Sequence, residues 1–363
     1  MFRVGWRSAR KTIITNKTSK EHVMKRLHLW LSAAAFALAS LVLAPVASAS
    51  TYSQTKYPIV MVHGAFGFDS ILGVVDYWYF ITNNMRRRGA EVYVVNMSSA
   101  ALHERRGEEL RDDIRQILAI SGAQKVNLIA HSQGATAARY VAALEPQWIA
   151  SVSCSHCMNE GTQFADGFIN TLNAIGIGGP IVDGAVTMLL NLLELISGVG
   201  SDGDYNSNLN VDQSMLDLAA ASQHDPSYVQ FNATYPDAMP SYKCWNDNAG
   251  RNGPGATLSR ASGASVANGI RWYSWGGNDP ITAWLDPFDS IVIPLAREFT
   301  GSAPLKWDGL VPTCGMALGQ ALRLNYKANH FDAINHALAI TAFGMNIPSI
   351  YYTHANRLKK AGL

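Results

Sequence analysis

A serine at the junction of a strand and a helix has the clearest potential for covalent chemistry. The stretch NLIAHSQGATAARY covers residues 127–140, and its apolar start ends at His131-Ser132-Gln133-Gly134, where a helix-like pattern begins. A serine on such a sharp turn can be a nucleophile. It can also be a plain helix N-cap beside a turn glycine. The motif alone leaves both open, because Ala130 stands where the G-x-S-x-G pattern has its first glycine.

A nucleophilic serine needs a histidine to accept its proton and a carboxylate to orient that histidine. The segment KWDGLVP (306–312) places Asp308 before a glycine in an expected turn. The segment NYKANHFD (325–332) places His330 in a polar loop before a short helical run. Since α/β hydrolases have the order Ser, Asp, His, the sequence predicts a catalytic triad of Ser132, Asp308 and His330.

Acyl transfer also requires backbone N–H groups that stabilise the negative oxygen of the tetrahedral intermediate. The segment HGAFGF (63–68) follows an expected strand and offers the N–H of Ala65. Gln133, directly after the serine, offers a second N–H. We therefore expect an oxyanion hole formed by the backbone of Ala65 and Gln133.

Buried strands and amphipathic helices must position these residues. Apolar runs predict strands within 57–64, 91–97, 125–132 and 148–154. Helices are expected over 76–89, which ends in basic residues and a glycine, and over 104–120, whose apolar residues share one face. Strands alternating with helices predict an α/β fold with a mostly parallel central sheet and helices on both faces.

The first 49 residues read as a cleaved export signal. Met24-Lys25-Arg26 precedes an apolar stretch over 29–43 and the small residues Ala47-Ser48-Ala49, which is the pattern of a secretory signal peptide. The apolar stretch is short for a membrane span. We expect cleavage after Ala49, one hydrolase domain over 50–363, and a secreted protein; whether residues 1–23 are translated stays open.

The basic character of the chain belongs to this leader. It holds eight Lys/Arg and one Glu, so the rest has 21 basic and 26 acidic residues, and the formal net charge changes from +2 to −5. Nothing in this charge balance favours nucleic-acid binding.

A helical insertion is expected at about 165–225. The stretch 181–196 is apolar except for one narrow polar stripe, and glycine-rich segments (174–179 and 198–203) flank it. The stripe consists of Asp183, Thr187, Asn191 and Glu194. An ordinary core helix is one interpretation; the wide apolar face and glycine flanks favour a mobile lid.

All four cysteines lie after the leader, at positions 154, 157, 244 and 314, where an exported protein can keep disulfides. The segment CSHC (154–157) is a weak zinc signal because it has no second cluster. A local disulfide and two free thiols both remain open.

Several long blocks carry a family resemblance. They are VHGAFGFDSILGVVDYWY, VNLIAHSQGA, WLDP, DGLVPTC, NHFDAIN and the ending THANRLKKAGL. Over 57–363 the chain closely resembles secreted triacylglycerol lipases of the Pseudomonas/Burkholderia type. The resemblance implies an α/β-hydrolase fold, the triad and oxyanion hole named above, and a membrane-anchored, lipase-specific foldase as a partner in secretion.

The resemblance also implies a structural calcium ion and a disulfide. The calcium ligands would be the carboxylates of Asp286 and Asp332 and the backbone carbonyls of His336 and Ile340, oxygen ligands of the kind Ca²⁺ prefers. The disulfide would join Cys244 and Cys314. Similar lipases have a G-[AT]-P-H-[KR]-G turn where this chain has HCMNEG (156–161).

The sequence thus favours a secreted, monomeric triacylglycerol lipase that works at lipid–water interfaces through a serine acyl-enzyme. The first alternative is a carboxylesterase or polyester depolymerase with the same triad. The alternative from another class is a non-catalytic lipid-surface binding protein, against which the complete Ser-Asp-His set argues. Acyl-chain length, regiospecificity and stereospecificity are not encoded in these motifs.

Overall fold

The computed structural model describes residues 50–65, 70–71, 75–98, 101–167, 170, 225–240, 263–300, 306–336 and 338–363. The chain divides into two units, Met1–Ala49 and Ser50–Leu363. The expected signal peptide, the apolar stretch 181–196 and Cys244 lie outside the described residues. None of the described helices is long and apolar enough to cross a membrane.

A seven-stranded sheet forms the centre of the second unit, in the order β4-β1-β5-β6-β8-β7, with β9 also paired to β8. All its pairs are parallel except that of β7 with β8. The strands are β1 (Ile59–Val62), β4 (Val92–Val94), β5 (Val126–His131), β6 (Ile149–Ser155), β7 (Val266–Ala267), β8 (Ile270–Gly277) and β9 (Gln320–Tyr326). The mostly parallel sheet predicted from the sequence is confirmed.

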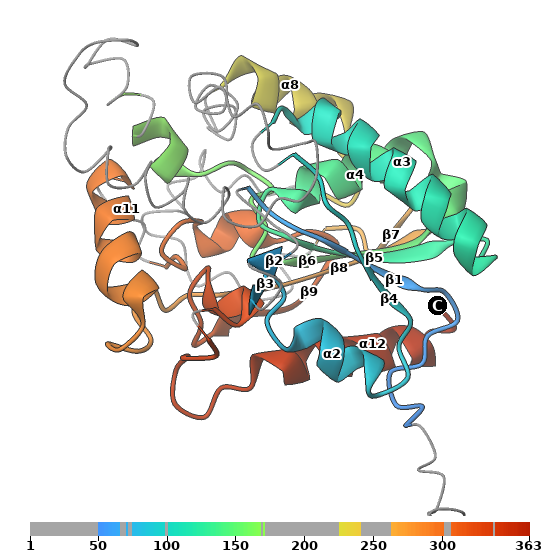
Figure 1. Ribbon diagram of the computed structural model, residues 1–363. Coiled ribbons are helices and arrows are strands. Elements are labelled where there is room, and N and C mark those ends of the chain that lie inside the picture. Colours follow the sequence, from blue (N-terminus) through green and yellow to red (C-terminus); the bar gives the residue numbers. More distant parts are fainter. Residues whose placement is uncertain are drawn as a thin grey trace, which may run out of the picture. The chain divides into compact units, whose positions relative to one another are not determined.

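Helices cover both faces of this sheet (Figure 1). On one face lie α3 (His103–Ser121), α4 (Gly134–Leu144) and α8 (Pro226–Thr234), and on the other lie α2 (Ile81–Arg86) and α12 (Ile347–Lys360). Further helical elements are η1 (Pro146–Trp148), η2 (Phe288–Val292), α11 (Ile293–Thr300), η3 (Thr313–Met316) and η4 (Asp332–Ile334).

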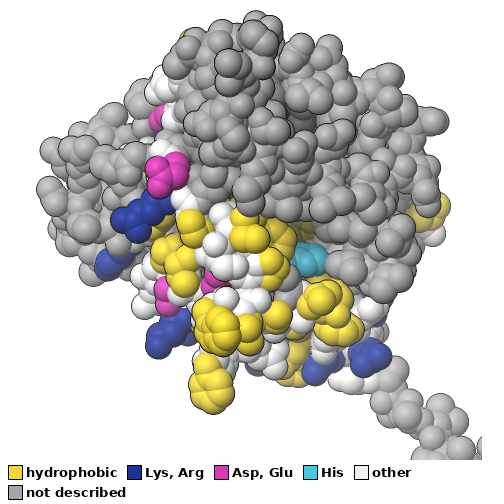
Figure 2. Space-filling model, turned by 60° about the vertical axis from the view of Figure 1, so that its left-hand side comes forward, with side chains coloured by type: hydrophobic (Ala, Val, Ile, Leu, Met, Phe, Trp, Pro, Cys, Tyr) yellow, Lys and Arg dark blue, Asp and Glu magenta, His cyan; other side chains and the backbone are white. Residues whose placement is uncertain are grey.

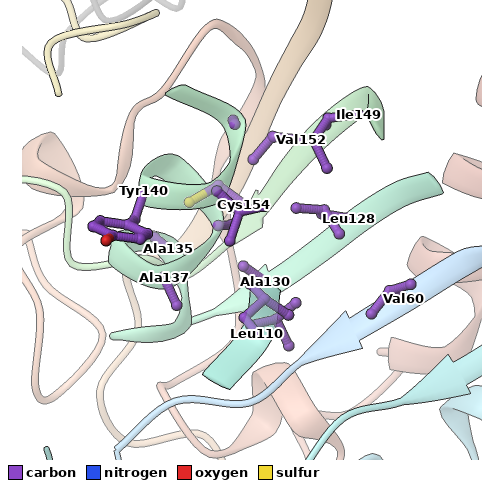
Figure 3. Packing of buried hydrophobic residues seen from close by; sticks show 14 of the residues in the cluster. Val60, Leu110, Leu128, Ala130, Ala135, Ala137, Tyr140, Ile149, Val152 and Cys154 are labelled. Carbon is purple, nitrogen blue, oxygen red and sulfur yellow. The ribbon is translucent and has the colours of Figure 1, made fainter. Parts of the chain in front are cut away.

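Two apolar cores result from the alternation of side chains along the strands. Val60 and Val62 of β1 pack in the core beneath α3 and α4, with residues such as Leu110 and Leu128 (Figure 3). Ile59 and Met61 of the same strand pack in the second core, with residues of α2 and α12. Strands with a core on each face must be apolar on both sides, which explains the uninterrupted apolar runs.

The helix expected over 76–89 is shorter than predicted. Val75–Asp76 forms strand β3, antiparallel to β2 (Ser70–Ile71), so the backbone there pairs with a strand. Phe80 then has a left-handed φ of 58°, and α2 begins only at Ile81. The basic residues and Gly89 end the helix as expected.

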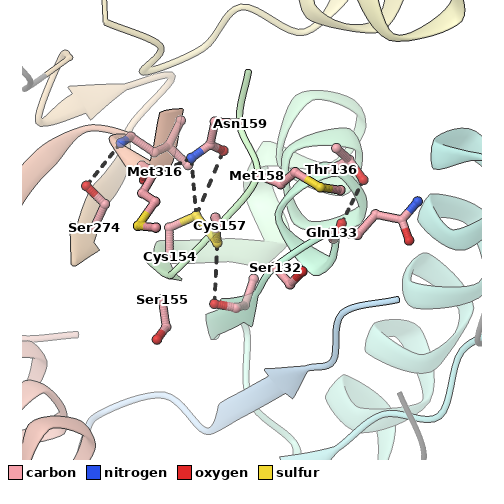
Figure 4. The surroundings of a disulfide bond; sticks show 12 residues. Ser132, Gln133, Thr136, Cys154, Ser155, Cys157, Met158, Asn159, Ser274 and Met316 are labelled. Atoms are coloured by element: carbon pink, nitrogen blue, oxygen red, sulfur yellow. Dashed lines mark hydrogen bonds between the residues drawn. A yellow bond between two sulfur atoms is a disulfide. The ribbon is translucent and has the colours of Figure 1, made fainter. Parts of the chain in front are cut away.

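The CSHC segment forms a local disulfide between Cys154 and Cys157, at the end of β6 (Figure 4). The two sulfurs are bonded to each other, so they are not the thiolate ligands of a zinc site. Cys314 is also disulfide-bonded, and the partner that the resemblance implies for it, Cys244, lies outside the described residues.

Candidate active site

The carboxyl ends of the parallel strands bring the predicted residues to one edge of the sheet, where open α/β sheets place their sites. Ser132 directly follows β5, and Ala65 follows β1, the neighbour of β5. His330 lies four residues beyond the end of β9, and Asp308 lies in the loop before that strand.

Ser132 occupies a strained turn. Its φ of 55° is left-handed, which is uncommon for a residue other than glycine and is the conformation of a nucleophile elbow. Two glycines make this turn possible. A Cβ on Gly64 would lie 2.6 Å from the Cβ of Ser132, and a Cβ on Gly134 would lie 2.6 Å from the carbonyl oxygens of Val62 and His63. Ala130, fully buried in the core, takes the place of the first elbow glycine.

The three predicted triad residues are joined by hydrogen bonds although they lie up to 198 positions apart in the chain. The Nδ1–H of His330 donates to Oδ2 of Asp308 at 2.8 Å. The hydroxyl of Ser132 donates to Nε2 of His330 at 2.9 Å. This arrangement lets His330 take the serine proton while its other nitrogen is held by a carboxylate.

Asp308 is fully buried yet remains ionised. Burial raises the pKa of its carboxyl, but the charge of His330 and hydrogen bonds from His156 and His330 outweigh burial and hold the pKa below its usual range. The backbone N–H groups of Leu310 and Val311 donate to Oδ1 at 3.1 and 2.7 Å. The turn predicted from Asp-Gly is present, since Gly309 has a φ of 100°.

The oxyanion-hole candidates flank the serine. Gln133 precedes the first residue of α4, and Ala65 lies in the turn after β1.

A buried arginine that sequence reasoning missed holds this region together. Arg106 of α3 donates to the carbonyls of His63 and Gly64 at 2.7 and 3.0 Å and to Oε1 of Gln133 at 3.2 Å. Burial lowers the pKa of Arg106 to about 10.

A second hydrogen-bonded chain, also missed, links the Gly64 turn to the histidine loop. The N–H of Gly64 donates to Tyr77 Oη at 3.0 Å, and this hydroxyl donates to Nδ1 of His131 at 2.7 Å. Nε2–H of His131 then donates to the carbonyl of His330 at 3.1 Å. Burial and the neighbouring His330 keep the pKa of His131 well below its ordinary value, so this histidine stays neutral.

Three acidic side chains are buried close to the histidine loop: Asp286, Asp289 and Asp332. Asn329 and Thr282 donate to Oδ2 of Asp332, whereas its buried Oδ1 has no hydrogen-bond partner among the described residues. Burial, together with the charges of Asp289 and Asp286, raises the pKa of Asp332 to about 7, although hydrogen bonds from Asn329 and Thr282 oppose the shift. The side chain of His336 contacts the carbonyl of Asp76. Of the atoms of His336, the backbone oxygen is therefore the candidate calcium ligand.

The fold and this site define the chain as an α/β hydrolase, and a family model of the alpha/beta hydrolase fold matches residues 57–167. A triacylglycerol lipase of Vibrio cholerae serotype O1 is 36% identical, covering 86% of this chain and 90% of that protein. A triacylglycerol lipase of Burkholderia plantarii is 33% identical, covering 87% of this chain and 89% of that protein. A triacylglycerol lipase of Pseudomonas fragi is also 33% identical, covering 85% of this chain and 98% of that protein. The chain belongs to the triacylglycerol lipase family and is a serine hydrolase.

Proposed function

We propose that the protein hydrolyses carboxylic esters of long-chain triacylglycerols at a lipid–water interface, with Ser132, His330 and Asp308 as its catalytic triad. The single observation that carries this proposal is the hydrogen-bonded series from Ser132 Oγ through His330 to Asp308. Membership of the lipase family supports the substrate class.

The reaction follows from the positions of the protons. Ser132 Oγ attacks the ester carbonyl while its proton passes to Nε2 of His330, and the new imidazolium is stabilised by ionised Asp308. Backbone N–H groups of Ala65 and Gln133 receive the negative oxygen. His330 then protonates the leaving alcohol, and water activated by the same histidine releases the fatty acid from Ser132.

Exposed apolar side chains support an interfacial substrate. In the described residues, Trp284 is 81% exposed and Leu285 is 64% exposed, while Phe343 is fully exposed. Figure 2 shows hydrophobic side chains gathered on one face of the molecule. Because large exposed apolar groups favour contact with lipid or protein, they fit a protein that acts on lipid droplets.

The competing function is a carboxylesterase or polyester depolymerase with the same triad. Rates on emulsified triolein and on dissolved tributyrin separate the two, since a lipase accelerates when its substrate forms an interface. A much higher rate on emulsified triolein is expected. Activity confined to dissolved short-chain esters would favour the esterase.

We further propose that calcium binds between Asp286 and Asp332. The buried Oδ1 of Asp332, which has no partner in the described part of the chain, and the buried carboxylate of Asp286 fit a hard divalent cation. The backbone carbonyls of His336 and Ile340 would complete the set. When bound, the ion would neutralise these carboxylates and brace the loop that carries His330.

We also propose that the protein is secreted and that a foldase assists its folding. The leader-like residues 1–49 support secretion through the periplasm, and the family resemblance supports a membrane-anchored foldase. Refolding of the mature chain tests the foldase: recovery of full activity without any helper protein would contradict this part.

A further inference from the structure

His156, in the middle of the CSHC segment, has no role in the reaction described above. It directly follows β6, so it reaches the same edge of the sheet as Ser132. Its side chain is 2% exposed.

The backbone holds His156 in an unfavourable conformation. Its φ of 50° lies in the left-handed region, where residues other than glycine are uncommon. The Cys154–Cys157 disulfide closes the turn around it, and the N–H of His156 donates to the carbonyl of Trp275 at 2.9 Å. Strain of this kind persists only where the surroundings fix it.

The neighbouring strand leaves room for the ring. A Cβ on Gly277, the last residue of β8, would lie 2.7 Å from Cε1 of His156 and 2.0 Å from the carbonyl oxygen of Ala328. Any larger residue at position 277 would therefore displace the imidazole or the backbone before the His330 loop.

The imidazole is directed at the triad carboxylate. Nδ1–H of His156 donates to Oδ2 of Asp308 at 3.0 Å, the same oxygen that receives Nδ1–H of His330 at 2.8 Å. The two backbone N–H groups on Oδ1 and these two imidazoles together provide four donors. A carboxylate has about four lone-pair sites, so His156 completes the coordination of a fully buried charge.

We propose that His156 is a positioning residue, which acts through Asp308 by fixing the carboxylate in the orientation and ionised state that hold His330. The inference rests on the proposed role of Asp308. Without the fourth donor, the Oδ2 atom has only His330 to hold it, and the carboxylate can rotate within its pocket. We then expect kcat to fall, because the side chain of His156 acts on Asp308 and, through it, on the catalytic histidine.

Two substitutions at position 156 separate the effect of losing the hydrogen bond to Asp308 from the effect of disturbing the left-handed backbone. Glycine and asparagine both accept a left-handed φ, but only asparagine keeps a donor, its Nδ2, where the imidazole has Nδ1. We expect His156→Gly to lower kcat on p-nitrophenyl butyrate about 10- to 100-fold with little change in KM, since a hydrogen bond to a charged group is lost. His156→Asn should retain most of the wild-type kcat.

A double variant tests whether the effect passes through Asp308. In an Asp308→Ala background, His156→Gly should change kcat less than twofold, because residues that act as a unit are not additive. If His156→Gly does not fold, His156→Ser, too short to reach Asp308, takes its place. His354→Ala is the matched control, as His354 is an equally buried histidine that contacts Ser153 and lies outside the triad.

The proposal is overturned if His156→Gly keeps kcat within twofold of wild type, if His156→Asn falls as far as glycine, or if the loss persists undiminished without Asp308. An inactive wild type, or activity that survives Ser132→Ala, would instead reject the proposed function.

Discussion

At the level of single residues, some members of the site could be predicted from the sequence and others could not. The three hydrogen-bonded residues could be predicted from sequence because the chemistry requires a serine, a histidine and an acid, and the chain has them in expected turns and loops in the order that α/β hydrolases use. Arg106 and His131 could not be assigned in this way. Their roles depend on contacts such as that between Arg106 and the carbonyl of His63, 43 positions away, for which the sequence has no local signal.

Buried neutral histidines should make the protein acid-sensitive. Burial and nearby Arg106 lower the pKa of His63 to about 3, and burial and Arg357 lower that of His354 to about 3. In the unfolded chain these histidines bind protons below their ordinary pKa of 6.5. In the native state they remain unprotonated until the pH approaches 3. The stability that these histidines contribute is complete above pH 6.5 and is lost as the pH falls towards 3.

Urea unfolding between pH 6 and pH 4 measures this loss. Each histidine contributes about 1.4 kcal/mol per pH unit to the slope of unfolding free energy against pH. His354→Gln, which keeps a donor for Ser153, should reduce the slope by about that amount. Equal slopes for this variant and the wild type would contradict the assignment.

Calcium should stabilise the fold through Asp332. Binding to the native state adds about 2.7 kcal/mol when the free ion is at 100 times its Kd, so melting curves in excess calcium and in EDTA should differ clearly. Asp332→Asn should abolish the difference. Asp112→Asn, at an exposed carboxylate on α3, should preserve it; identical curves for the wild type in both conditions would exclude the site.

At the scale of elements, the ends of β1 and β5 and the start of α4 are packed as one unit. The sequence predicted these elements well, because buried parallel strands are apolar throughout. It failed at residues 76–80, where the end of strand β3 and a turn replace the start of the helix expected over 76–89. Such a pairing depends on β2, which has only two residues and no periodic pattern to recognise.

The elbow should not tolerate a methyl group at Gly134. The new Cβ would meet the backbone carbonyls of Val62 and His63 at 2.6 Å, and backbone cannot move aside as a side chain can. Displacing the serine by a fraction of an ångström should lower kcat roughly 10- to 100-fold. Gly315→Ala is the matched control, as its Cβ meets nothing closer than 3.7 Å. Wild-type kcat in Gly134→Ala would contradict this account of the elbow.

The proposed lid helix at 181–196 lies outside the described residues. Its wide apolar face predicts a helix that covers the site in water and rests against lipid at an interface. Replacing Leu189 and Leu193 with serine should reduce activity on emulsified triolein far more than on dissolved tributyrin, because burying each leucine is worth roughly 1.5–3 kcal/mol. An equal reduction on both substrates would mean that this helix belongs to the core.

At the scale of the whole molecule, an α/β hydrolase of the lipase family is combined with a leader-like segment and a triad braced by polar groups from several elements. His131 ends β5 and His156 follows the neighbouring strand β6, and their side chains donate to the carbonyl of His330 and to the carboxylate of Asp308. The CSHC segment illustrates the limit of motif reading. Its spacing gave a weak zinc signal and left a local disulfide open; the structure has the disulfide and directs the intervening histidine to the carboxylate of Asp308.

The most direct test of the central claim is the hydrolysis of p-nitrophenyl butyrate by the wild type and by Ser132→Ala at equal concentrations of folded protein. We predict rapid hydrolysis by the wild type and a loss of several orders of magnitude in the variant, near the uncatalysed rate, because triad members act together. Wild-type activity in Ser132→Ala, with melting curves that match, would contradict it.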